Sequence, residues 1–93
     1  MDIQEMRNEI DSIDEELVKL FCHRMDVATQ IAEYKKENNL PIFVPTRERE
    51  VLAKVAGQAG NELGNYTRVL YSMHLELSRS YQSKKTLTTG ALH

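Results

Sequence analysis

The first forty residues carry a long helical pattern of apolar positions. Ten positions separated by steps of three and four form a seam in which nine are apolar: Ile3, Met6, Ile10, Ile13, Leu17, Leu20, Arg24, Val27, Ile31 and Tyr34. Such a seam is typical of a helix that packs lengthwise against other helices. Asp2 caps the start, with Glu5 three residues later as in a capping box. Asn38 and Asn39 mark the end, so the pattern predicts one helix from about Asp2 to Asn38.

Two shorter helices are predicted after this segment. Pro45 is placed to open the second helix, whose apolar stripe is Val51, Leu52 and Val55 and which ends at Gly57 or Gly60. The loop Gly60–Gly64 follows, and Asn65 caps a third helix that runs to about Lys84. The stripe of this third helix is Tyr66, Leu70, Met73, Leu77 and Tyr81. The chain is therefore expected to be all-α, with three helices, one of them very long.

The end of the chain lacks such a pattern. Residues 86–93 show no periodicity, which predicts a flexible C-terminal tail after a helical domain formed by residues 1–85.

The first helix is too long for a single small domain. At ~1.5 Å per residue it would extend ~55 Å, whereas a compact chain of this length has a radius of gyration near ~12–13 Å. The helix must therefore project beyond its own domain and expose its apolar seam. An identical chain is the simplest source of a covering surface, so we expect an intertwined homodimer.

Composition and charge narrow the classes of function. The formal net charge of −2 does not favour non-specific binding of nucleic acid. The sequence starts Met-Asp-Ile-Gln-Glu, without the basic and apolar regions of a signal peptide, and no apolar run approaches the ~20 residues that cross a bilayer. The single cysteine, Cys22, cannot form an internal disulfide. A cytoplasmic protein with neither a membrane nor a nucleic-acid partner is expected.

Two cations lie where a buried apolar face is expected. Arg24 is the one polar residue of the seam, and Lys35 lies eleven residues later, only about 20° away around the helix. Buried arginine needs a partner, so an anion held between helices is one interpretation. Alternatively, Arg24 reaches out of the seam or pairs with an internal carboxylate. Lys35 alone also suits the end of a helix.

Arg7 lies beside the same seam but far from the other two cations. It is ~25 Å from Arg24 along the helix axis, a distance that no small metabolite bridges. If Arg7 serves the same ligand, it must come from the partner chain in an antiparallel pairing. Otherwise it is an ordinary surface residue.

Further polar residues are predicted on packed helix faces. Arg47 and Glu48 precede Val51 and Leu52 by one turn, and Ser78 and Gln82 continue the line that begins at Leu75, although a solvated helix end would also explain each of them. The histidines do not form a metal-ligand pattern, and Cys22 has no matched base. We therefore expect neither a metal nor a catalytic thiol.

Together these motifs resemble the all-helical AroQ class of chorismate mutases over about residues 3–83. The carriers are Met6–Asp14, Arg24-Met25, Ala32–Lys35, Arg47–Glu50 and Leu77–Gln82. The spacing of Arg7, Arg24 and Lys35, followed by Arg-Glu, is much more specific than any single motif. The resemblance implies an intertwined homodimer with two equivalent sites. It also implies conversion of chorismate to prephenate, in the shikimate pathway of aromatic amino acid biosynthesis.

The resemblance also implies roles for individual residues. Arg24 and Lys35 would hold the substrate carboxylates together with Arg7 from the other chain, and Ser78 would lie near the ring carboxylate. Lys35 and Gln82 would donate hydrogen bonds to the ether oxygen.

By the same resemblance, Glu48 would take the ring hydroxyl and Arg47 would support the site. Val44 departs from the family, which often has an aspartate there, so only a main-chain contact to the substrate is expected at this position.

The chemistry fits these residue types. The reaction is a Claisen rearrangement that needs no nucleophile, metal or cofactor, only a dianion held in its reactive conformer and donors for the ether oxygen. Two alternatives remain open. One is an isochorismate-pyruvate lyase of the same fold, against which Glu48 argues. The other is a non-catalytic helical module for dimerisation, regulation or binding of another protein's helix, which would have no need for Arg24 in the seam.

Overall fold

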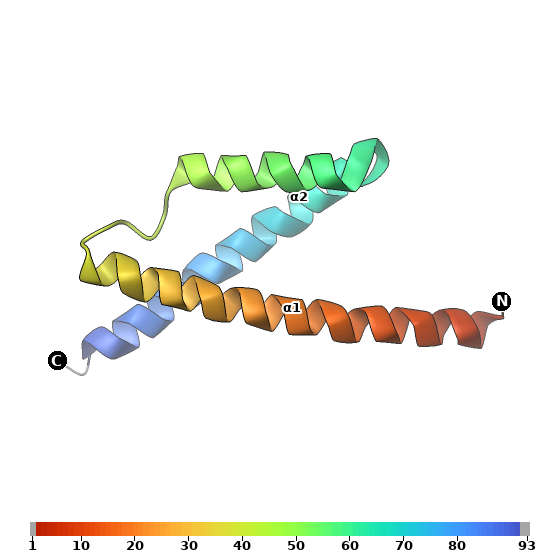
Figure 1. Ribbon diagram of the computed structural model, residues 1–93, viewed down its shortest axis with the longest axis horizontal. Helices are drawn as coiled ribbons and strands as arrows, with labels where there is room; N and C mark the ends of the chain where they lie inside the picture. The colour runs from red at the N-terminus through yellow and green to blue at the C-terminus, as the bar shows by residue number, and fades with distance from the viewer. Residues whose placement is uncertain (1, 92–93) are drawn as a thin grey trace.

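The computed structural model describes residues 2–91, and this part of the chain is all-helical, as expected. It has two helices, α1 (Ile3–Glu37) and α2 (Pro45–Ala91), joined by residues 38–44 (Figure 1). The prediction of three helices was therefore wrong. Neither helix has a stretch long and apolar enough to cross a membrane within the described residues.

Local sequence signals set the bounds of α1. The Asp2 carboxylate accepts a hydrogen bond from the backbone N–H of Glu5 at 2.8 Å, which satisfies one of the free donors at the helix start. Lys35 and Lys36 lie in the last turn, where cations complement the helix dipole. Asn39 then takes a positive φ of 56°, a conformation that asparagine tolerates, and ends the helix. The predicted long first helix is confirmed.

Helix α2 begins at Pro45, as predicted, and reverses direction within its own length. Gly60 leaves helical geometry with φ 85° and ψ 179°, and the helix resumes at once. The expected loop Gly60–Gly64 and the cap at Asn65 were wrong, because glycine can make this reversal in a single residue. Gly64 is also needed for the close approach of the two arms, since a Cβ there would lie 3.1 Å from the Ala56 carbonyl oxygen.

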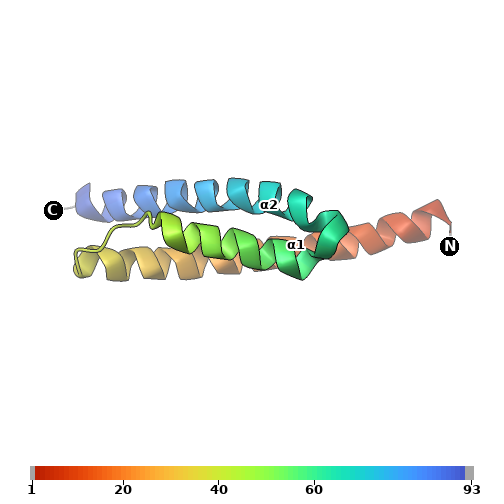
Figure 2. The same ribbon diagram turned by 90° about the horizontal axis from the view of Figure 1, so that it is seen from above.

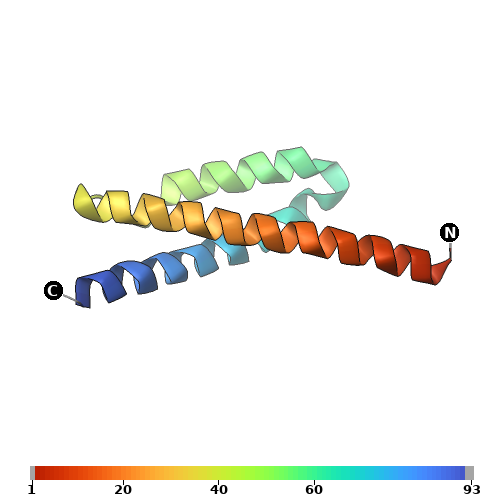
Figure 3. The same cartoon turned by 60° about the horizontal axis from the view of Figure 1, so that its bottom comes forward.

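The arms of α2, residues 45–59 and 61–91, lie differently against α1. The first arm runs alongside α1, and the second returns and crosses it (Figures 1 and 3). The N-terminal end of α1, drawn in red, projects beyond the reversal at Gly60 (Figure 2). The chain is accordingly elongated, with extents of 57 × 28 × 15 Å and a radius of gyration of 16.7 Å.

The core of the single chain is very small. Among residues 2–86, whose burial is described, the buried apolar residues are Ala28, Ala32, Val51 and Leu75, whereas all nine apolar positions of the α1 seam remain exposed. So few buried side chains cannot offset the conformational entropy lost by about ninety ordered residues. The exposed seam agrees with the geometric reason for expecting a homodimer, which stays a prediction.

The predicted tail, residues 86–93, also stays a prediction. Helix α2 is described as far as Ala91, and residues 92 and 93 lie outside the described residues.

Candidate active site

A cavity of about 310 Å³ lies between α1, the connecting segment and both arms of α2. Its lining includes seven of the eight residues that the sequence nominated: Arg24, Lys35, Val44, Arg47, Glu48, Ser78 and Gln82. Apolar side chains such as Val27, Ile31 and Val51 form much of the remaining wall. The fold thus brings polar groups that lie up to 58 residues apart in sequence, from Arg24 to Gln82, to one cavity.

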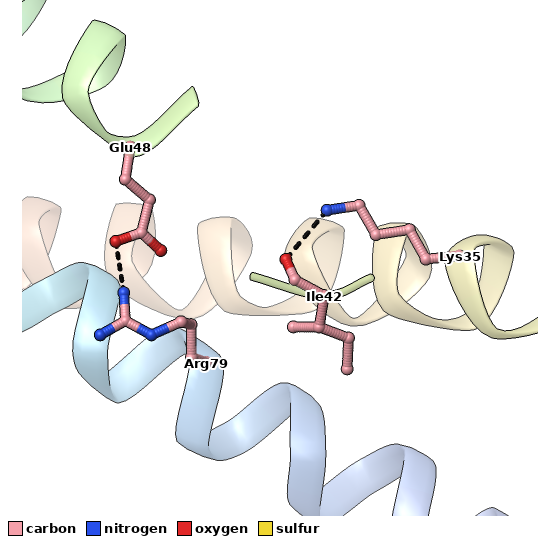
Figure 4. Close-up of polar contacts among 4 residues, drawn as sticks. All are labelled: Lys35, Ile42, Glu48 and Arg79. Atoms are coloured by element: carbon pink, nitrogen blue, oxygen red, sulfur yellow. Dashed lines mark hydrogen bonds and ion pairs between the residues drawn. The ribbon is translucent and has the colours of Figure 1, made fainter. Parts of the chain in front are cut away.

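Lys35 faces this cavity from the end of α1. Its ammonium donates a hydrogen bond to the Ile42 carbonyl at 3.0 Å, so the connecting segment holds its position (Figure 4). An ammonium has three N–H groups, and this bond uses one. The other two remain for an acceptor within the cavity.

Ser78 and Gln82 are two buried polar residues on the second arm of α2. They are only 5% and 8% exposed. The Gln82 amide donates a hydrogen bond to the Ala28 carbonyl of α1 at 2.8 Å, which fixes its orientation across the two helices. Because the amide nitrogen carries two hydrogens, one donor stays available. The alternative that Ser78 and Gln82 are solvated residues at a helix end is therefore wrong.

Glu48 and Arg79 form an ion pair across the cavity wall (Figure 4). Glu48 lies in the first turn of α2 and Arg79 on its second arm, and both side chains are largely shielded from solvent. The Arg79 guanidinium also lies over the Phe43 ring, 4.7 Å from its centroid. These contacts fix the direction of the Glu48 carboxylate.

Arg24 stands between the cavity and a second, more apolar hollow. Its Nη1 donates a hydrogen bond to Nε2 of His74 at 2.8 Å, and its guanidinium lies 5.7 Å from the centroid of the Tyr71 ring. Burial lowers the pKa of His74 below its ordinary value, and the charge of Arg24 lowers it further. A neutral His74 is the form that accepts this bond.

Two nominated residues lie closer to solvent. Arg47 lines the cavity but is exposed, and its guanidinium lies 3.7 Å from the Glu50 carboxylate. Arg7 is exposed and does not line the cavity, because it lies in the first turns of α1, about 25 Å from Arg24 along the axis. Within one chain, Arg7 cannot reach a ligand held by Arg24 and Lys35.

Sequence reasoning missed Arg79 and His74. Helical spacing could have identified Arg79, because it lies four residues after Leu75 and three before Gln82 and therefore on the same helix face. His74 gave no comparable signal, because its partner is fifty residues away.

The cavity is electropositive. Four cations, Arg24, Lys35, Arg47 and Arg79, line it with a single carboxylate, Glu48. Among the described residues, no group of three His, Cys, Asp or Glu side chains is placed to hold a metal ion. Fixed cations and oriented hydrogen-bond donors on an apolar wall suit a small organic anion with more than one negative group.

Comparison with known proteins gives a consistent picture. The family model described as chorismate mutase type II matches residues 6–83. A bifunctional chorismate mutase/prephenate dehydratase from Aquifex aeolicus is 48% identical over 54 residues, which cover 58% of this chain. The T-protein of Haemophilus influenzae is 40% identical over 50 residues, or 54% of this chain. A chorismate mutase from Methanocaldococcus jannaschii is 34% identical over 53 residues, or 57% of this chain.

These relatives are longer than the matched part. The aligned region covers 15% of the Aquifex protein, 13% of the Haemophilus protein and 54% of the Methanocaldococcus protein. No solved structure matches the chain.

Proposed function

Because the chain belongs to the chorismate mutase type II family, whose model matches residues 6–83, we propose that it catalyses the rearrangement of chorismate to prephenate. The observation that carries this proposal is the cavity of about 310 Å³ with four cations, one oriented carboxylate and a buried amide. Chorismate is a dianion with a ring hydroxyl and an ether oxygen, and each of these groups has a complementary side chain in the cavity.

Cations hold the two carboxylates of the substrate. Arg24 and Lys35 bind them from α1, Ser78 lies near the ring carboxylate, and Arg47 supports the outer side. Guanidinium and ammonium groups already fixed by the fold bind carboxylates without first losing side-chain freedom. Two fixed anchor points also restrict a flexible substrate to its chair-like reactive conformer, which removes entropy from the barrier.

The rearrangement itself breaks a C–O bond while a C–C bond forms within the same molecule. Negative charge grows on the ether oxygen as the C–O bond lengthens. The spare N–H groups of Lys35 and Gln82 donate hydrogen bonds to this oxygen. These hydrogen bonds become stronger as negative charge develops on the oxygen. An acceleration of ~10⁶ requires about 8 kcal/mol of such differential stabilisation, so we assign the largest share to Lys35, Gln82 and Arg24.

Glu48 accepts a hydrogen bond from the ring hydroxyl. Its ion pair with Arg79 supports this role, because the pair aims one carboxylate oxygen and leaves the second free for the substrate. The Val44 side chain offers no polar group at the cavity wall, and its carbonyl already accepts a hydrogen bond from the Glu48 N–H at 3.1 Å. Any polar contact from Val44 is therefore a main-chain one.

A second copy of the chain completes the site. Its α1 would cover the exposed seam and bring Arg7 to the cavity from outside, so that each homodimer holds two equivalent sites. Support comes from the nine exposed apolar seam positions and from the distance that separates Arg7 from Arg24 within one chain. We place this mutase unit within residues 1–85, and we propose a cytoplasmic setting from the single free cysteine, Cys22.

The direct test is to incubate the purified protein separately with chorismate and with isochorismate and to identify the products. Formation of prephenate from chorismate is expected. Release of pyruvate from isochorismate, with no prephenate from chorismate, would instead assign the lyase reaction.

A matched variant separates the enzyme from a non-catalytic helical module. Arg24→Leu removes the cation from the seam and should abolish prephenate formation while the protein stays folded. If the wild-type protein forms no product and Arg24→Leu is only more stable, the chain is a structural module.

A further inference from the structure

We infer that His74 is a positioning residue for Arg24: its neutral imidazole accepts a hydrogen bond that directs the guanidinium towards the substrate cavity. This inference rests on the proposed function for its catalytic consequence, and on the contact between the two side chains for its physical basis. His74 itself does not line the cavity, so it acts on the substrate only through Arg24.

Arg24 lies between two hollows of the fold. Arg24 lines the electropositive cavity and also the second hollow of about 330 Å³, whose other lining residues are Leu17, Leu20, Phe21, Leu70, Tyr71 and His74. His74 therefore contacts the guanidinium from the second hollow, whereas the electropositive cavity is lined by Arg24 and not by His74. A guanidinium carries five N–H donors, so the one bond to His74 leaves the others for a carboxylate.

The His74 ring is itself held in place by aromatic contacts. Phe21 of α1 meets it edge-on with ring centroids 5.3 Å apart, and Tyr71 lies 5.5 Å away on the same arm of α2. Tyr71 also lies beneath the Arg24 guanidinium. An imidazole fixed by two rings presents its Nε2 lone pair in one direction, which suits an acceptor that must orient a long side chain.

Protonation would reverse the interaction. Only the neutral imidazole with its proton on Nδ1 accepts at Nε2, whereas an imidazolium has no acceptor and would repel the guanidinium. The charged or titratable groups that face His74 are Arg24 from α1 and Tyr71 from α2, with no facing carboxylate among the described contacts. The lowered pKa of His74 keeps it neutral at neutral pH.

The consequence is an acid limit on activity. As pH falls below 6.5 and through the lowered pKa of His74, the bond to Arg24 is lost and kcat/KM should fall. The Gln82 amide does not change its donor character over this range, because an amide does not titrate. His74 should therefore set the acid limb of the profile.

The test compares pH profiles of kcat/KM for wild type, His74→Gln, His74→Leu and the control His23→Gln. Glutamine offers a non-titrating acceptor, so His74→Gln should keep most activity at pH 7.5 and lose the acid limb. Leucine offers no acceptor, so His74→Leu should lose roughly tenfold to a hundredfold at pH 7.5. His23 is exposed next to Arg24 in sequence but has no described contact with it, so its variant should follow wild type.

A second measurement decides the contact without activity. NMR titration should give His74 a pKa below the ordinary histidine value of 6.5, and Arg24→Gln should move the His74 value back towards 6.5. An acid limb that persists in His74→Gln, or normal activity in His74→Leu, would overturn the positioning role. If wild type forms no prephenate at any pH, the proposed function fails, and a His74 pKa insensitive to Arg24→Gln would then overturn the pairing as well.

Discussion

Leu17→Ala should weaken the homodimer by a predictable amount. Leu17 lies in the middle of the α1 seam and is 57% exposed in the single chain. Full burial of a leucine side chain contributes about 1.5–3 kcal/mol, so covering the exposed half contributes about 1–1.5 kcal/mol per chain. A twofold interface buries the residue twice, which gives about 2–3 kcal/mol for the dimer. The dissociation constant should therefore rise about 30- to 150-fold.

The assay is sedimentation equilibrium combined with circular dichroism over a dilution series. Because only four buried apolar residues are found among residues 2–86 of the single chain, dissociation and unfolding should coincide, and the melting temperature should rise with protein concentration. Lys19→Ala is the matched control, since Lys19 is exposed two residues further along α1 and its ion pair with Glu16 is also exposed. An unchanged dissociation constant in Leu17→Ala, or a folded monomer at every concentration of wild type, would refute the reasoning.

Two further substitutions test the donors at the ether oxygen. In steady-state kinetics, Lys35→Ala should lower kcat/KM by about 10²–10³, the usual loss for one oxyanion donor. The control Lys36→Ala should keep wild-type activity, because the Lys36 ammonium does not line the cavity and donates a hydrogen bond to the Thr86 carbonyl. Near-normal activity of Lys35→Ala would show that the assignment is wrong. Gln82→Glu should donate only when protonated. Its kcat/KM relative to wild type at the same pH should therefore rise from pH 8 to pH 5, and an equal ratio at the two pH values would contradict a hydrogen bond from residue 82.

Local signals made much of the backbone predictable. The Asp2 cap and the helix start at Pro45 depend on residues next to the helix end, and both are found where the sequence placed them. The reversal in α2 was mispredicted as a five-residue loop. Three glycines spaced over eight residues, Gly57, Gly60 and Gly64, allow either a loop or a one-residue break, and the choice depends on how closely the two arms pack at Gly64.

Part of the candidate site could likewise be predicted from local spacing, whereas another part depends on how the helices pack. Arg24, Ser78 and Gln82 could be nominated because a polar residue interrupts or extends an apolar stripe, which helical spacing reveals. The partners that orient them could not be nominated by that route. Arg79 meets Glu48 only because α2 folds back on itself, and His74 meets Arg24 only because the second arm crosses α1 (Figure 3).

The central claim is that cations from two chains enclose one dianion, and subunit complementation tests it most directly. Arg7→Ala and Lys35→Ala are purified as separate homodimers, each nearly inactive, then mixed, unfolded and refolded together. If Arg7 acts across the interface, half of the dimers are mixed and each has one intact site, so about a quarter of the wild-type kcat/KM should return. If Arg7 acts within its own chain, no mixed dimer contains an intact site and activity should stay at the level of the separate variants. If Arg7 serves no site, the Arg7→Ala homodimer should already be active before mixing.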